Sequence, residues 1–180
     1  MQKSRLYGLL TLGAALAGSV TLAQTKAPAP ISAQAQRGKD FFLKTDKGVA
    51  CGTCHQVGGV GTAVGPDLTK LAGPVGARGI ISTIQMSMTA YVQEYKTKEG
   101  DFVGIPKEGT SNSQIWDLTD NKPALKEMKP GDITSQKQNE KWKHPPATAT
   151  YTPQELADLI AWLKYASTGK NVEIKVSDVR

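Results

Sequence analysis

The chain has 180 residues with 22 basic and 16 acidic side chains, which gives a formal net charge of +6 at pH 7. This length suits one domain with a modest hydrophobic core. The positive charge is too small and too scattered to predict binding to nucleic acid, so we expect no nucleic-acid partner.

The first 23 residues have the features of a secretory signal peptide. Lys3 and Arg5 precede an uncharged, mostly apolar stretch that ends in small residues at Ala23. A stretch of about 18 apolar residues could also serve as an uncleaved membrane anchor, but its glycines and the cleavage pattern favour removal. We therefore expect cleavage of residues 1–23, export to the periplasm and no stable membrane insertion afterwards. Cleavage lowers the net charge to +4, from 20 basic and 16 acidic side chains.

A flexible, proline-containing leader is expected over residues 24–32, before a single domain over residues 33–180. The domain begins with a predicted amphipathic helix over 33–44. A glycine-rich loop follows, where glycines would let the backbone lie close to a flat ligand. Apolar side chains at helical spacing predict another helix over 79–88.

Residues 91–133 have a different pattern, in which short apolar runs alternate with turn signals. This pattern predicts a small antiparallel β insertion. The strands are expected at 91–97, 102–105, 114–118 and 124–128, with turns at 98–101 and 120–121. The polar segment 135–143 is expected to be a loop.

The closing helix has the clearest boundaries. Thr152 and Glu155 form a capping box, with Pro153 at the first helical position. Gly169 is expected to end this helix, and the tail 168–180 is expected to be either a final strand or an ordered segment. Apolar residues form one stripe along the helix: Leu156, Leu159, Ile160 and Leu163.

The only two cysteines of the chain lie in a C-x-x-C-H motif, formed by Cys51, Cys54 and His55. Such a motif supplies two thiols for thioether bonds to the vinyl groups of a haem, and a histidine for its iron. Two alternatives are a zinc half-site and a redox dithiol. Zinc would need further ligands, and the chain has no other cysteine and one other histidine. A thioredoxin-like dithiol would need a βαβ context, which the pattern lacks. We therefore expect one covalently bound haem c.

Together with this motif, the two ends of the domain resemble a class I monohaem cytochrome c. In that family the first and last helices cross over the haem, and Gly38, Phe42, Leu159 and Trp162 match the residues at the crossing. The resemblance implies a mainly α cytochrome c fold. It also implies that the carbonyl of Pro66 accepts a hydrogen bond from the ligating histidine, which would fix its tautomer.

The resemblance covers residues 36–166. The β insertion makes it more specific, to one group of cytochrome c domains. Haem-binding cytochrome c domains associated with large periplasmic or membrane-bound dehydrogenases have a short β insertion before the distal ligand. Residues 91–133 would correspond to that insertion. The resemblance implies redox proteins such as a dehydrogenase or an oxidase as partners.

The distal ligand departs from the usual family pattern, in which a Met-Pro pair precedes the last helix. His144 and Pro145 stand at that place, so we expect ligation by His55 and His144. Met128 is the rival distal ligand because Pro130 follows it closely, although its predicted strand also favours a packing role. A five-coordinate or exchangeable iron, with His144 in an exposed loop, is the third alternative.

A six-coordinate iron with two histidines would have no free position for a substrate. We therefore expect one-electron transfer between periplasmic partners and no enzymatic activity, with a lower reduction potential than His/Met ligation gives. Two other functions remain open. One is a haem-based sensor or small-ligand binder with a labile distal ligand, and the other is a peroxidase-like enzyme with an open iron.

Overall fold

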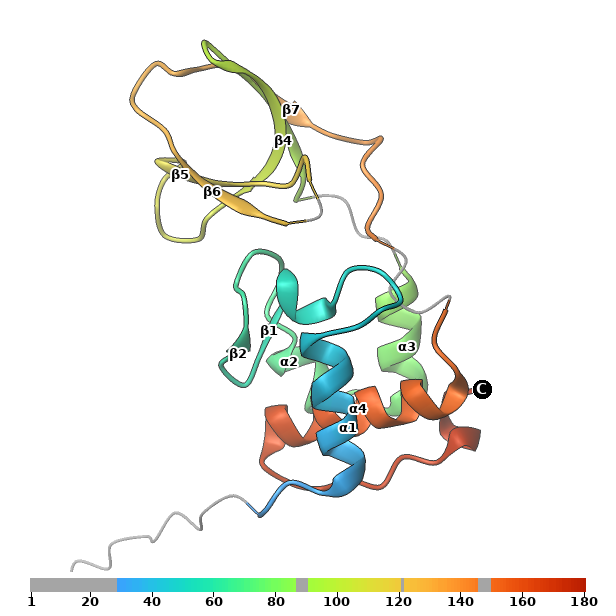
Figure 1. The fold of residues 1–180 in the computed structure, drawn as a ribbon. Coiled ribbons are helices and arrows are strands. Elements are labelled where there is room, and N and C mark those ends of the chain that lie inside the picture. Colours follow the sequence, from blue (N-terminus) through green and yellow to red (C-terminus); the bar gives the residue numbers. More distant parts are fainter. Residues whose placement is uncertain (1–28, 87–90, 121, 146–149) are drawn as a thin grey trace, which may run out of the picture.

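A computed structural model describes residues 29–86, 91–120, 122–145 and 150–180. The chain has a mixed α/β architecture in which a helical lobe and a β lobe lie one above the other (Figure 1). This corrects the mainly α expectation. The elements are α1 (Ala33–Leu43), η1 (Cys51–Thr53), β1 (Gln56–Val57), β2 (Val60–Gly61), α2 (Thr69–Ala72), α3 (Ala77–Gln85), β3 (Gln93–Thr97), β4 (Gly100–Pro106), β5 (Gln114–Asp117), β6 (Ala124–Glu127), β7 (Ile133–Gln138), α4 (Pro153–Thr168) and η2 (Val176–Val179).

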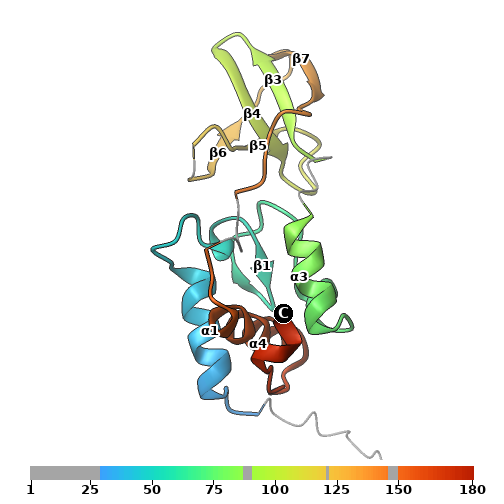
Figure 2. The same cartoon turned by 90° about the vertical axis from the view of Figure 1, so that its right-hand side faces the viewer.

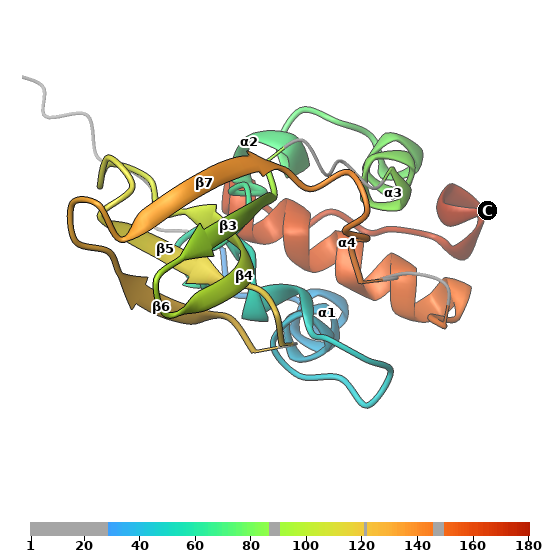
Figure 3. The ribbon, with the colours of Figure 1, turned by 90° about the horizontal axis from the view of Figure 1, so that it is seen from above.

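The first and last helices pack against each other, as expected, and cross steeply (Figure 3). Gly38 permits the close approach, because a Cβ atom there would lie 1.9 Å from the backbone oxygen of Asp158. Phe42 packs against Trp162 one turn further on, with ring centroids 6.5 Å apart. The guanidinium of Arg37 donates two hydrogen bonds to the buried carboxylate of Asp158. The crossing of the two helices is therefore held by close backbone contact, aromatic packing and one ion pair.

Helix α4 begins and ends as the sequence predicts. The Thr152 hydroxyl accepts a hydrogen bond from the Glu155 amide, and the Glu155 carboxylate accepts one from the Thr152 amide. Gly169 ends the helix with a φ of 69°, in the left-handed region. Three members of the apolar stripe are buried, and each contributes about 2 kcal/mol of stability: Leu159, Ile160 and Leu163.

The tail packs against the first turn of α1 and the residues just before it. The Gln34 side chain donates to the Ile174 carbonyl and accepts from the Ile174 amide, at 2.8 and 3.1 Å. The carbonyl of Ala29, in the expected leader, accepts a hydrogen bond from the Tyr165 hydroxyl. The tail forms the short helix η2 and no strand, and Ile174 and Val179 are buried in the core of the helical lobe. Residues 1–28, with the expected signal peptide and most of the leader, lie outside the described residues.

The β lobe is a five-stranded antiparallel sheet in the order β6-β5-β4-β3-β7, and it curls strongly (Figures 1 and 2). The expected hairpin between 91–97 and 102–105 forms, with Tyr95 opposite Phe102. These two rings stack and, with Ile115, form a small core on one face of the sheet. The turn expected at 120–121 includes Asn121, which lies outside the described residues.

The expected loop at 135–143 is wrong for its first part, because residues 133–138 form strand β7. This strand pairs with β3 through its backbone, and its side chains are mostly exposed and polar. An edge strand of this kind has no alternating apolar pattern to reveal it. The insertion therefore extends to Gln138 and not only to residue 133. Among the described residues, no helix is long and apolar enough to cross a membrane.

Candidate functional site

The C-x-x-C-H motif lies on a tight turn at the end of the helical lobe that faces the sheet (Figure 1). Cys51 begins the short helix η1, and its carbonyl accepts a hydrogen bond from the amide of His55 at 2.8 Å. Gly52 brings the turn close to α1, since a Cβ atom there would lie 2.9 Å from the ring of Phe42. The first helix therefore supports the turn that carries both cysteines and His55.

The ring of His55 is held by a backbone carbonyl at its Nδ1 atom. Its Nδ1 atom lies 2.8 Å from the carbonyl oxygen of Pro66, as the resemblance implies, and donates a hydrogen bond to it. Gly65 makes room for the ring, because a Cβ atom there would lie 2.9 Å from its Cε1 atom. Burial lowers the pKa of His55, more than the bond to Pro66 raises it. The neutral ring thus has its proton on Nδ1 and a lone pair on Nε2.

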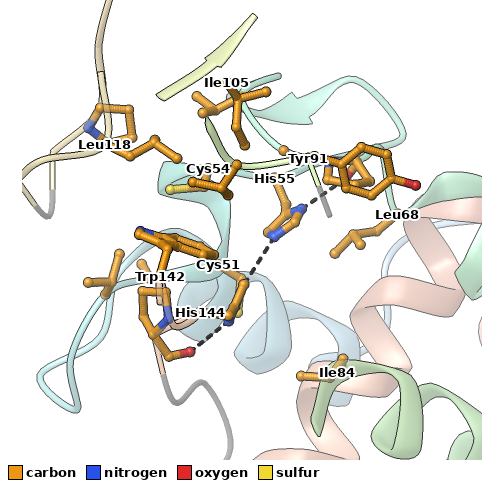
Figure 4. Close-up of a pocket in the computed structure, with 18 of the residues that line it drawn as sticks. Cys51, Cys54, His55, Leu68, Ile84, Tyr91, Ile105, Leu118, Trp142 and His144 are labelled. Atoms are coloured by element: carbon orange, nitrogen blue, oxygen red, sulfur yellow. Dashed lines mark hydrogen bonds between the residues drawn. The ribbon is translucent and has the colours of Figure 1, made fainter. Parts of the chain in front are cut away.

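His144 approaches the same point from the segment between β7 and α4 (Figure 4). Its Nδ1 atom lies 2.7 Å from the carbonyl oxygen of Pro145, which again requires a proton on Nδ1. The Nε2 atoms of His55 and His144 face each other 3.5 Å apart. With only the Nδ1 proton on each ring, the two Nε2 lone pairs would face each other, an arrangement that a metal ion between them would stabilise.

A cavity of about 590 Å³ surrounds the two histidines, a size typical of cofactor pockets. Its walls come from both lobes and are mostly apolar (Figure 4). The helical lobe contributes Phe42, Leu68, Ile84 and Leu159, and the β lobe contributes Val103, Ile105 and Leu118. Sequence patterns did not identify the β-lobe wall residues as site residues, because the contact between the two lobes is a property of the tertiary structure.

The two cysteines line this cavity beside the histidines and form no disulfide. Burial raises the pKa of the Cys51 thiol to about 11, and it also raises the pKa of Cys54. A reactive dithiol has the opposite shift, since its thiolate is stabilised. Among the described residues, no group of three His, Cys, Asp or Glu side chains is arranged to hold a metal ion. The arrangement therefore favours neither a redox dithiol nor a zinc site.

The donor set fits a haem c. The cavity offers two thiols, two imidazole nitrogens that face each other and apolar walls for a flat macrocycle. An imidazole nitrogen binds a transition metal at about 2.0 Å, so two of them on one ion lie about 4 Å apart. The two histidines need to separate by only about half an ångström from their 3.5 Å distance to reach that spacing.

The rival ligand Met128 does not line this cavity. It packs against the core of the β lobe and lines a separate small cavity of about 230 Å³. Met86 lines the large cavity but is 63% exposed, and Met88 lies outside the described residues. Trp142 packs edge-on against His144, with ring centroids 6.0 Å apart. His144 is therefore the residue that the structure places opposite His55.

Comparison with known proteins does not assign the chain to a family. No family model matches it, and no curated protein matches it significantly.

Proposed function

We propose that this protein is an exported monohaem cytochrome c of the class I type, which transfers single electrons between periplasmic redox partners. The observation that carries the proposal is the pair of facing imidazoles. The Nε2 atoms of His55 and His144 meet 3.5 Å apart inside an apolar cavity that also holds the thiols of Cys51 and Cys54. A covalent haem with two axial histidines explains all four side chains at once.

Each residue has a distinct role in this proposal. Cys51 and Cys54 would form the thioethers, and His55 and His144 would bind on the two axial sides. The Pro66 and Pro145 carbonyls hold the rings in the tautomer that leaves Nε2 free to bind a metal. A bound haem would supply a one-electron couple at its iron. The apolar side chains from both lobes exclude water and so limit reorganisation around that charge change.

Electron transfer is favoured over catalysis because two protein ligands leave no position for a substrate. The crossing of α1 and α4 at Gly38 also supports a cytochrome c type of fold. Partners would be redox proteins such as a dehydrogenase or an oxidase, in agreement with the predicted export. The alternative is a haem sensor, whose distal histidine leaves on reduction. It is kept open because His144 lies on a segment without helix or strand.

The test is spectroscopic and uses the purified full-length holoprotein. We expect a low-spin spectrum with two histidines in both oxidation states and no methionine-to-iron charge-transfer band. Replacing the distal histidine, H144A, should convert the iron to high spin. A low-spin H144A variant would refute the assignment of the distal ligand. Rapid stoichiometric carbon monoxide binding by the ferrous wild type would favour the sensor.

A further inference from the structure

The segment that carries His144 leaves the β lobe at a well-defined point, where β7 ends beside the start of β3 (Figure 2). Gln138 is the last residue of β7 and pairs with Gln93. The next amide, from Asn139, donates to the carbonyl of Val92 at 2.9 Å. Val92 and Asn139 are both buried. The backbone at Asn139 is therefore attached to the sheet five residues before His144.

The side chain of Asn139 then turns the chain toward the cavity. Its Oδ1 atom accepts hydrogen bonds from the amides of Lys141 and Trp142, each at 2.9 Å. An asparagine that binds the amides two and three residues later mimics a backbone turn and fixes its direction. Asn139 is only 6% exposed, and Asp158 is the other buried polar or charged residue among those described. A buried amide needs such partners, so the turn has little freedom to open.

The turn ends at Trp142, whose indole contacts the distal histidine. The indole lines the cavity and packs edge-on against the ring of His144, with an interplanar angle of 87°. Lys141 and Lys143 on either side are exposed. The contacts of this segment therefore pass from Asn139 to Trp142 and from Trp142 to His144.

We propose that Asn139 is a positioning residue, which holds the turn that keeps His144 opposite His55 and thereby limits how often the distal position opens. This inference rests on the proposed function, since it concerns the ligand of that site. Without the side chain, the amides of Lys141 and Trp142 lose their acceptor. Each such hydrogen bond is worth roughly a fivefold change in an equilibrium. Loss of both should raise the population with His144 dissociated by about 25-fold.

The experiment measures carbon monoxide binding to the ferrous holoprotein and the high-spin fraction of the ferric form. We expect N139A to bind carbon monoxide on the order of 25-fold faster than wild type, and to show a larger high-spin fraction. N139D keeps an oxygen at the same place, so its carbon monoxide binding rate and high-spin fraction should be near those of the wild type. N139S keeps a shorter acceptor and should give an intermediate rate, which also provides a test if N139A does not fold. The control Q138A changes the exposed neighbour in β7 and should behave as wild type.

The outcomes separate the two proposals. If the wild type itself binds carbon monoxide as fast as a five-coordinate haem, the two-histidine function fails. If the wild type is inert and N139A and N139S are equally inert, the function stands and the role of Asn139 is refuted. The role of Asn139 would also be refuted if N139D binds carbon monoxide as fast as N139A does, since the acceptor oxygen would then not be the cause.

Discussion

Replacement of Gly38 by alanine tests the packing that supports the whole cavity. The new Cβ atom would lie 1.9 Å from the backbone oxygen of Asp158 and 2.9 Å from the amide nitrogen of Leu159. Contacts below 3.0 Å are essentially absent around real Cβ atoms. Both neighbours belong to the backbone of α4, which cannot move aside as a side chain can. The two helices must therefore separate by about 1 Å, against close packing on both sides.

Two opposing effects set the size of the change. Overpacking of this kind costs about 1–3 kcal/mol, and the backbone contact places G38A at or above the upper end. Alanine in a helix gains about 1 kcal/mol over glycine. We expect a net loss of about 2 kcal/mol in the free energy of unfolding, which for a domain of this size lowers the melting temperature by about 4–8 °C.

The assay is urea denaturation of the holoprotein followed by far-ultraviolet circular dichroism, with the midpoint as the readout. A matched control is G79A in α3, where the new Cβ atom would meet only a side-chain methyl of Val75. G79A should lie within about 0.5 kcal/mol of wild type, because its gain in helix propensity offsets that contact. A midpoint for G38A at or above that of G79A would refute the proposed cause.

Three further changes test the cap and the cofactor site. The Lys47 ammonium and the Thr152 amide hold the pKa of Glu155 below its usual value. The ionised Glu155 carboxylate therefore contributes to stability above about pH 4.5, and this contribution is lost as pH falls through the lower folded pKa. E155Q should therefore be less stable than wild type at pH 7, with a difference that shrinks below about pH 4 in urea titrations at each pH. If Cys51 forms a thioether, C51S should retain haem through one remaining bond, whereas the C51S/C54S double variant should release it on acidic extraction into organic solvent. M128L should leave the visible spectrum and the reduction potential unchanged, because Met128 packs in the β lobe away from the cavity.

Short-range sequence signals predicted where the last helix, α4, begins and ends. The capping box, the proline at the first helical position and Gly169 act within a few residues, so α4 could be predicted with its boundaries. The crossing of α1 and α4 was expected from the resemblance to class I cytochromes c, and Gly38 and Phe42 lie at the crossing in the structure. Strand β7 was missed because an exposed edge strand has no alternation of apolar and polar residues.

The C-x-x-C-H motif and its sequence context predicted a haem as the cofactor, because the motif's two cysteines and histidine lie within five residues of the chain. What faces His55 was a matter of tertiary structure. His144 lies 89 residues away. Its place before the last helix made it the expected distal ligand, but the sequence left Met128 as a rival. Only the folded chain brings its Nε2 atom to 3.5 Å from that of His55 and leaves Met128 in another lobe. The choice depends on where β7 ends, which its long-range pairing with β3 decides and sequence periodicity does not encode. Asn139 then turns the backbone through two local hydrogen bonds.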